Sequence, residues 1–382
     1  MKVAIVHELL TMKGGAERVV RIFSEMFPEA PIYTLLYDEE KMGDWFPKSR
    51  IRTSSIQKNT HHYSLTTNHY NHHLYLNQFP RAVEAWDFSR YDLVLSSSSA
   101  FIHGIITNGK PKHLCYVQSP ARYLWDRTHD VIDEASHGIL GPLKRRYLER
   151  TFHRLRIWDT EAADRPDVVL AASKEVQRRV ELYWRRDSEV VYPPVDDVWL
   201  RASSDESRDL RSSQLAARDH FLIVSTLSRY KRIDLAIQAA NQLGVPLKIA
   251  GTGPDKHRLK KLAGPTIEFL GFRSEEELKD LYANAKALIF PGEEDFGLTP
   301  LEAMACGPPV IAYKKGGALE TIVDGSTGTF FDEPTAESLS QVMQLFDQSR
   351  YSSDTCRAQA ERFNRKNFEK KILEKIKQMM SY

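Results

Sequence analysis

The sequence has few cysteines. Only three occur among 382 residues, Cys115, Cys306 and Cys356, and no two of them form a CxxC pair. This pattern argues against a disulfide framework and against a zinc site, and it is typical of a reducing compartment. We therefore expect a cytoplasmic protein that is held together by its hydrophobic core.

Long apolar runs and a large charge imbalance are also missing. No run of eighteen apolar residues exists, and the start, MKVAIVHELL, is too short and too polar for a signal peptide. The formal net charge is only +2, and hydrophobic residues make up 42%. Such a composition is typical of an ordinary globular protein rather than a nucleic-acid-binding or disordered one. The length predicts two to three domains.

Short apolar runs alternate with polar or helical stretches in two series. The first comprises KVAIVH, PIYTLLY, YDLVLSSS, KHLCYV and PDVVLAAS, and the second FLIVSTL, PLKIAGTG, TIEFLG, ALIF, PPVIAY and TGTFF. Continuous apolar runs are typical of strands that are buried on both faces of a parallel sheet. We predict two α/β domains, residues 1–195 and 220–361, which bind ligands at the carboxyl ends of their strands. Residues 196–219 lose hydrophobic periodicity and are expected to form a linker.

The stretch 291–309, PGEEDFGLTPLEAMACGPP, is typical of a strand end, a tight loop and a helix. Glu294 is placed in the loop, before Phe296 and Gly297, and Glu302 is expected in the first turn of the helix. The backbone N–H groups at a helix start favour anions and polar ligand atoms. Two carboxylates at this place indicate recognition of a hydroxyl-rich ligand, although a glutamate near a helix start is also a common structural feature.

Gly14 and Gly15 stand between the first strand and an amphipathic helix over residues 19–26. Glycines allow a close approach of the backbone to a phosphate, and a helix start supplies unpaired N–H groups. The pair can therefore hold a diphosphate, or it can be a simple turn.

Histidines are concentrated in residues 61–73, HHYSLTTNHYNHH, which hold several of the thirteen in the chain. The spacing of His69 and His73 would place two imidazoles on one helical face, as a metal site requires. No cysteine or carboxylate lies among them. The segment can be a metal site, a loop that contacts an acceptor substrate or a plain solvated segment.

A basic segment covers residues 143–158, LKRRYLERTFHRLRIW. Arg146, Arg150 and Arg154 recur at a spacing of four, with Leu143 and Tyr147 beside them, so that a helix here is cationic and amphipathic. Such a face can dock on anionic lipid headgroups, or it can be an ordinary solvated helix face.

Several motifs, taken in order along the chain, carry a resemblance to a known family. They are GGAER, YPPVD, SRYKRIDLAIQAA, GTGP, EEDFGLTPLEAMACGPPVIAYKKGGALETIVDG and TGTFFDEP. Together they resemble the GT-B glycosyltransferases of the large retaining family with a Glu-x7-Glu motif, the glycosyl transferases group 1. In the first half, APIYTLLYD, YDLVLSSSS and HLCYVQSPARYLWD are similar to mannosyltransferases of surface-polysaccharide assembly.

The resemblance implies an architecture and a set of roles. Two Rossmann-like domains would face each other across a cleft, the first binding the acceptor and the second a nucleotide sugar, and a C-terminal helix in residues 362–382 would pack on the first domain. Glu302 would bind the ribose and Glu294 the donor sugar, while Lys231 and Arg229 would neutralise the diphosphate. The expected catalytic residues are Glu294, Lys231, Arg229 and Gln118, and the expected donor-binding residues are Gly14, Gly15, Thr226, Gly251, Asp295, Phe296, Gly297, Leu298 and Glu302.

Two positions depart from the family pattern. Gln118 stands where relatives usually carry a histidine that contacts the donor sugar or the reaction centre, and glutamine cannot carry a proton. Thr226 replaces an arginine that usually precedes the lysine by five positions, and Arg229 lies close enough in sequence to substitute for it. Nucleotide binding is still expected, whereas the rate and the exact donor depend on these two residues.

The function implied by the resemblance is retaining transfer of a hexose, most simply mannose from GDP-mannose, to a glycan or polyprenyl-linked acceptor. A catalytically weak nucleotide-sugar-binding subunit and a transferase for a UDP-sugar are the alternatives. Glycoside hydrolysis fits poorly, because hydrolases place two carboxylates on opposite sides of the scissile bond. No Asp-x-Asp pair is present to hold a metal on a diphosphate, so we expect metal-independent transfer. We do not expect nucleic acid as a partner. We do expect peripheral contact with the inner face of the cell membrane.

Overall fold

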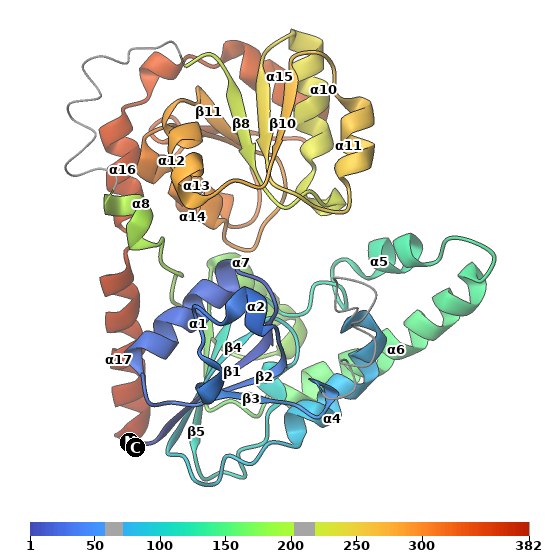
Figure 1. The fold of residues 1–382 in the computed structure, drawn as a ribbon, viewed down its shortest axis with the longest axis vertical. Helices are drawn as coiled ribbons and strands as arrows, with labels where there is room; N and C mark the ends of the chain where they lie inside the picture. The colour runs from blue at the N-terminus through green and yellow to red at the C-terminus, as the bar shows by residue number, and fades with distance from the viewer. Residues whose placement is uncertain (58–71, 202–217, 382) are drawn as a thin grey trace. The chain divides into compact units, whose positions relative to one another are not determined.

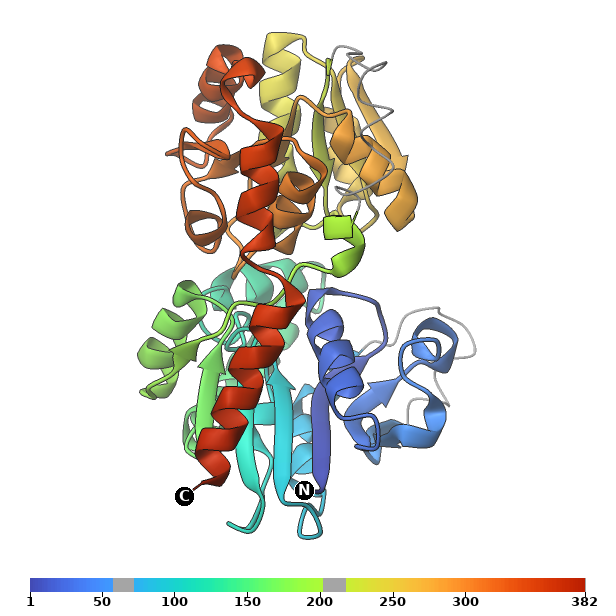
Figure 2. The same ribbon diagram turned by 90° about the vertical axis from the view of Figure 1, so that its left-hand side faces the viewer.

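The computed structural model describes residues 1–57, 72–201 and 218–381. Contacts among the residues divide the chain into two compact units, one made of Met1–Val191 with Glu369–Tyr382 and the other of Tyr192–Phe368. Each unit is built on one parallel β-sheet with helices packed against it (Figure 1, Figure 2). The prediction of two α/β units is therefore confirmed.

The first unit contains a seven-stranded sheet in the order β3-β2-β1-β4-β5-β6-β7, and all of its pairs are parallel. The strands are β1 (Val3–Leu10), β2 (Ile32–Tyr37), β3 (Ile51–Thr53), β4 (Leu93–Ser98), β5 (Lys112–Val117), β6 (Val168–Ala171) and β7 (Glu189–Val190). The five strands expected from apolar runs are all present. The edge strands β3 and β7 were not expected, because they are only three and two residues long and largely exposed.

Helices of the first unit include α1 (Gly15–Met26), α2 (Glu39–Met42), α4 (Phe79–Glu84), α5 (Thr128–Ala135), α6 (Gly141–Ala162) and α7 (Lys174–Arg179). The amphipathic pattern of α1 buries Val19, Val20 and Phe23, and the Phe23 ring packs edge-on against Tyr116 of β5 at 6.1 Å between centroids. This packing fixes the start of α1, and with it Gly14 and Gly15, relative to the sheet.

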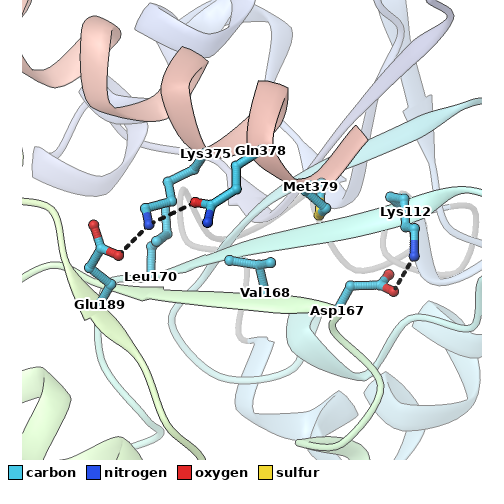
Figure 3. A pocket seen from close by; sticks show the side chains of 8 residues that line it. All are labelled: Lys112, Asp167, Val168, Leu170, Glu189, Lys375, Gln378 and Met379. Carbon is cyan, nitrogen blue, oxygen red and sulfur yellow. Dashed lines mark hydrogen bonds and ion pairs between the residues drawn. The ribbon is translucent and has the colours of Figure 1, made fainter. Parts of the chain in front are cut away.

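The last helix, α17 (Arg365–Met380), contributes its residues from Glu369 onward to the first unit. Lys375, Gln378 and Met379 lie over β6 and β7 and line a cavity of about 420 Å³ with them (Figure 3). Its charged side chains are paired, since Lys375 bonds Glu189 and Lys112 lies 3.4 Å from Asp167. The cavity is therefore part of the packing between this helix and the sheet, as the expected C-terminal helix requires.

The second unit contains a six-stranded parallel sheet in the order β10-β9-β8-β11-β12-β13. Its strands are β8 (Phe221–Val224), β9 (Leu247–Ala250), β10 (Ile267–Gly271), β11 (Ala287–Phe290), β12 (Val310–Tyr313) and β13 (Gly328–Phe331). Successive residues of β8 enter different cores, Phe221 and Ile223 one and Leu222 the other. Alternation of this kind shows that both faces of the sheet are covered by helices.

The helices of the second unit are divided between these two cores. Residues of α10 (Ile233–Leu243), α11 (Lys256–Leu262) and α15 (Ala336–Leu345) pack in one core. Residues of α8 (Asp197–Arg201), α12 (Glu275–Ala283), α13 (Leu298–Cys306), α14 (Ala318–Thr321) and α16 (Ser353–Glu361) pack in the other.

The expected linker, residues 196–219, begins with ordered structure. Asp197–Arg201 forms α8, and the indole ring of Trp199 is fully buried against Tyr282 at 5.7 Å between centroids. This helix was not predicted from the sequence, because its apolar residues Val198 and Trp199 are followed by a long polar stretch. Residues 202–217 lie outside the described part of the chain. Among the helices that are described, none has both the length and the apolar composition needed to cross a membrane.

A buried polar cluster in the first unit surrounds Asp159 of α6. Its Oδ2 atom accepts hydrogen bonds from the indole N–H groups of Trp125, at 2.9 Å, and Trp184, at 2.7 Å. The Trp184 ring also stacks on His103 at 4.2 Å. Burial raises the pKa of Asp159 to about 7, although the two indole hydrogen bonds act in the opposite direction.

This raised pKa predicts a loss of stability as the pH rises. The folded state holds a proton on Asp159 that the unfolded state has released, so the free energy of unfolding falls through neutrality, by about 1 kcal/mol between about pH 6 and pH 8. The variant Asp159→Asn removes this contribution. Denaturant unfolding followed by tryptophan fluorescence measures the difference in pH dependence, and five of the six tryptophans belong to the first unit.

The comparison with the variant is necessary because His103 and His113 are also buried. Burial lowers the pKa of each to about 3, so they destabilise the folded protein as the pH falls. The effect of His113 is common to both proteins and cancels, whereas His103 Nε2 lies 3.5 Å from Asp159 Oδ1, so that the comparison measures Asp159 together with its contact with His103. An equal pH dependence in the two proteins would contradict the prediction.

Candidate functional site

The carboxyl edge of the second sheet has the topology of a ligand-binding crevice. The chain leaves β8 for β9 on one side and leaves β11 for β12 on the other, so that the two connections diverge from neighbouring strands. Ligands of open α/β sheets bind at such a switch point. The loop after β8 carries Thr226, Arg229 and Lys231, and the loop after β11 carries Glu294.

An ion pair between Lys231 and Glu294 joins these two loops. The Lys231 Nζ atom bonds Glu294 Oε1, and the two side chains are only 20% and 15% exposed. The ammonium group also lies 4.9 Å from the centroid of the Tyr230 ring. Burial lowers the pKa of Lys231, but the Glu294 charge and hydrogen bond outweigh burial and raise the pKa above its ordinary value. Lys231 is therefore a cation at neutral pH.

Glycines after β12 support the loop that carries Glu294. The Gly317 N–H donates to the Glu294 carbonyl oxygen at 3.0 Å. A Cβ atom at Gly317 would overlap the backbone of Phe296, and one at Gly316 would overlap the carbonyl of Glu294. Beside them, Lys315 Nζ lies 3.1 Å from Glu293 Oε2. The sequence analysis missed these residues, although the KKGG motif could have indicated them.

Glu302 lies one turn further into α13 than expected. Gly297, with a left-handed φ of +89°, is the N-cap of this helix, and Leu298 is its first residue. The prediction that Glu302 belongs to the first turn is therefore wrong, because the glycine begins the helix ahead of Pro300. Glu302 is buried, and its Oε2 accepts a hydrogen bond from the Tyr282 hydroxyl at 3.3 Å.

The other expected residues of this unit lie on the same edge. Thr226 and Arg229 are exposed and Asp295 is partly buried. Gly251 follows β9 with a φ of +130°, and a Cβ atom there would overlap the Ser225 carbonyl. The Phe296 ring is buried and stacks on Tyr192 at 5.5 Å, so only its backbone is available to a ligand.

Three expected residues lie in the first unit, at the carboxyl ends of its own strands. Gly14 is the N-cap of α1 and Gly15 is its first residue. Gln118 follows β5, and its Nε2 donates to Ser97 Oγ at 3.1 Å. The buried residues His7 and Glu8 of β1 were not predicted, although they are the two polar residues of an otherwise apolar strand, VAIVHELL, and this could have indicated them.

The histidine segment lies largely outside the described residues, which include only the backbone of His72 and His73 at the start of a short 3₁₀ helix. In the described part of the chain, no three histidine, cysteine, aspartate or glutamate side chains come together as metal ligands would. The proposal of a metal site in residues 61–73 is therefore not tested.

Comparison with known structures identifies the fold as GT-B. A crystal structure of Anabaena Alr3699/HepE in complex with UDP matches over 99% of this chain and 100% of its own, with a TM-score of 0.69 and 17% identity. Sucrose-phosphate synthase from Thermosynechococcus elongatus also has a TM-score of 0.69, at 15% identity over 99% of each chain. At these identities the likeness is one of fold.

A family model matches part of the sequence. Residues 208–363 match the model of the glycosyl transferases group 1, and this segment contains the loops that carry Lys231 and Glu294 and the helix that carries Glu302. The match covers most of the second unit but less than half of the chain.

Individual relatives match over parts of their length. Alpha-1,3/1,6-mannosyltransferase ALG2 of Dictyostelium discoideum is 47% identical over 72 residues, 19% of this chain and 17% of its own. D-inositol 3-phosphate glycosyltransferase of Mycolicibacterium smegmatis is 32% identical over 45% of this chain and 42% of its own. GDP-mannose-dependent alpha-mannosyltransferase of Corynebacterium glutamicum is 30% identical over 49% and 44%. The matched regions thus span less than half of each of these three relatives.

The contact of Gly317 with Phe296 predicts that Gly317→Ala disturbs the Glu294 loop. Gly317 has an ordinary φ of −63°, so that the effect of the methyl group is purely steric. We expect the free energy of unfolding to fall by about 1–3 kcal/mol. The amides of Phe296 to Leu298 should exchange hydrogen faster, as measured by mass spectrometry.

Gly244→Ala is the matched control. Gly244 has a φ of +65°, and a Cβ atom there meets nothing within 4 Å. It should cost about 1 kcal/mol through backbone strain and leave exchange in the loop unchanged. Equal exchange in both variants would show that Gly317 does not support the loop.

Proposed function

We propose that the protein is a retaining glycosyltransferase that transfers a hexose from a nucleotide sugar to a glycan or polyprenyl-linked acceptor in the synthesis of cell-surface polysaccharide or glycolipid. The observation that carries this proposal is the largely buried pair of Lys231 and Glu294. It lies at the switch point of the second sheet, in a segment that matches the family model of the glycosyl transferases group 1. A cation beside a carboxylate provides one group for a diphosphate and another for sugar hydroxyls.

GDP-mannose is the donor that we favour. Two of the relatives are mannosyltransferases, and one of them is named as GDP-mannose-dependent. A UDP-sugar is the alternative, because the structurally similar HepE has been crystallised with UDP and with UDP-glucose. The exposed residues Thr226 and Arg229 lie in the loop after β8 and are available to distinguish between donors.

Donor binding would exchange the partners of the ion pair. Lys231, with Arg229 beside it, would turn to the diphosphate, and Glu294 would accept hydrogen bonds from the sugar hydroxyls, with the backbone N–H groups of Phe296 to Leu298 next to it. Glu302 would bind the ribose hydroxyls. The Gly14-Gly15 helix start would add N–H donors for the diphosphate.

The chemical step would depend on charge stabilisation. The bond between the anomeric carbon and the diphosphate breaks, and the acceptor oxygen bonds to that carbon on the same face. The acceptor proton passes to the departing phosphate oxygen. Lys231 and Arg229 stabilise the growing negative charge, so that we propose transfer without a divalent metal.

Gln118 determines whether this chemistry is fast. It replaces a histidine of the family pattern, and its amide is already bonded to Ser97 Oγ. An amide can position a hydroxyl but cannot carry a proton. A nucleotide-sugar-binding subunit with weak activity is therefore the second candidate function, and binding without turnover for a panel of donors would establish it.

The variant Glu294→Gln tests the site. It keeps the size of the side chain but removes the charge that holds Lys231, and transfer should fall by about 100-fold or more while the fold is retained. Transfer of radiolabelled sugar from GDP-mannose to a lipid-linked acceptor, in the presence of EDTA, provides the measurement. Wild-type turnover in this variant would refute the site.

Asp332→Asn is the matched control. Asp332 pairs with Lys314 at 2.9 Å in the same unit, but both side chains are more than half exposed. Loss of this surface pair should change neither transfer nor stability noticeably, because exposed ion pairs contribute about 0–1 kcal/mol.

We also propose that α6 brings the protein to an anionic membrane surface. Arg146, Arg150 and Arg154 are all exposed on this helix, and no carboxylate pairs with them among the described residues. Four large apolar side chains are exposed in the loop between α5 and α6 and in the first two turns of α6. They are Ile139, Leu140, Leu143 and Tyr147. Cations with neighbouring exposed apolar groups are typical of a surface that lies at a lipid interface.

Reversal of the three arginine charges to glutamate tests this proposal. Each basic residue near an anionic surface contributes about 1 kcal/mol, so the affinity for vesicles with phosphatidylglycerol should fall by about 100-fold or more in a sedimentation assay. Reversal of Lys366, Lys371 and Lys377, which are exposed on α17, is the control and should have a smaller effect. Unchanged binding of the α6 variant would leave this helix face as an ordinary solvated surface.

A further inference from the structure

His7 is a buried residue that bridges two elements of the first unit. It is only 2% exposed, near the carboxyl end of β1. Its Nδ1 atom lies 3.0 Å from the carbonyl oxygen of Ser97 in β4. Its Nε2 atom lies 3.4 Å from Oε1 of Glu17 in α1. The imidazole therefore connects the first turn of α1 to the sheet.

The partners of His7 determine its charge. A carbonyl oxygen and a carboxylate oxygen can only accept hydrogen bonds, so both ring nitrogens need a proton to satisfy them. The neutral ring has one N–H group, and only the imidazolium has two. The Glu8 carboxylate lies 3.8 Å from Nδ1, so that each ring nitrogen has a carboxylate near it. The geometry thus calls for a cation between two carboxylates.

Electrostatics around the ring support the same state. Burial lowers the pKa of His7, but the hydrogen bond and charge of Glu17 and the charge of Glu8 outweigh it, and the pKa is raised above its ordinary value. The charged groups that face the ring are Glu8 from β1 and Glu17 from α1. Its register partner in β2 is Thr34, which does not titrate.

Glu17 lies where it affects the start of α1. It is the acidic residue of the first turn, and no side chain caps this helix. A Cβ atom at Gly14 would lie 2.6 Å from Glu17 Oε2, so the carboxylate occupies the space beside the glycine. A negative charge there opposes binding of any anion to the N–H groups of Gly15 and its neighbours.

We propose that His7 is a positioning residue that neutralises Glu17 and so allows the Gly14-Gly15 helix start to accept the diphosphate of the nucleotide sugar. This inference rests on the proposed function, because it needs a diphosphate ligand. His7 itself does not touch the donor. It acts by pairing with the Glu17 carboxylate, whose negative charge beside the helix start it neutralises.

The role of Gly14 follows from the same contact. Its backbone is extended, with a φ of −127° that any residue can adopt. A Cβ atom here would overlap the end of the flexible Glu17 side chain, so that a side chain at this position displaces the carboxylate with which His7 pairs.

The experiment measures binding of GDP-mannose and UDP-glucose by calorimetry between about pH 6 and pH 8.5. Their diphosphate diesters do not titrate in this range, so a change in affinity reports on the protein. In the wild type, affinity for the donor that binds should fall as the pH rises through the raised pKa of His7, by about tenfold overall. Binding of the corresponding nucleoside, which has no phosphate, should not change.

Variants separate the charge from the packing. His7→Gln should bind the donor about tenfold more weakly at all pH values, because Glu17 is no longer neutralised. Glu17→Gln should bind as tightly as the wild type at low pH, without pH dependence. The double variant should regain this affinity, which a purely structural loss could not explain. Glu25→Gln, at the exposed far end of α1, is the matched control and should behave as the wild type.

The outcomes distinguish this inference from the proposed function. Donor binding that is independent of pH, or a double variant as weak as His7→Gln, overturns the role of His7 while leaving a nucleotide-sugar site. Wild-type protein that binds neither donor at any pH overturns the proposed function and this inference with it. Melting temperatures of all variants are recorded, and a folded His7→Gln protein with wild-type affinity also overturns the inference.

Discussion

The largely buried ion pair between Lys231 and Glu294 is the interaction on which the proposed site depends. Removal of one partner would leave the other as an uncompensated charge with little access to water. The pair forms only because two loops from neighbouring strands end at the same edge of the sheet. A donor can separate the two groups only by giving each a new partner, so that the pair itself holds the charges that a nucleotide sugar needs.

Buried carboxylates are accommodated in three different ways in this protein. Glu294 has a lysine as its partner. Glu8 accepts hydrogen bonds from four consecutive backbone N–H groups, Ser99 to Ile102, at 2.9–3.1 Å. Asp159 keeps a proton up to about neutral pH. The lysine partner can be given up to a ligand, whereas the backbone donors around Glu8 belong to the fold itself. This difference distinguishes a carboxylate of the site from structural ones.

Much of the fold and part of the site could be predicted from the sequence. Apolar runs identified the central strands, since strands buried on both faces cannot contain many polar residues. Glu294, Lys231 and Gly251 were recognised because they belong to continuous motifs. The contact of His7 with Glu17 was not recognised, because the two residues are ten positions apart in the sequence and belong to a strand and a helix. The position of Glu302 was misjudged by one turn, since a left-handed glycine rather than a polar cap begins the helix.

Gly316 and Gly317 have a consequence for how such a site can diversify. Any side chain at either position would collide with the backbone of the Glu294 loop, so substitution of these two glycines is sterically excluded. Thr226 is exposed on the opposite loop, where no such collision limits its exchange. Evolution of a new donor preference, or its redesign in the laboratory, is therefore open at this position on the β8 side and closed at the two glycines.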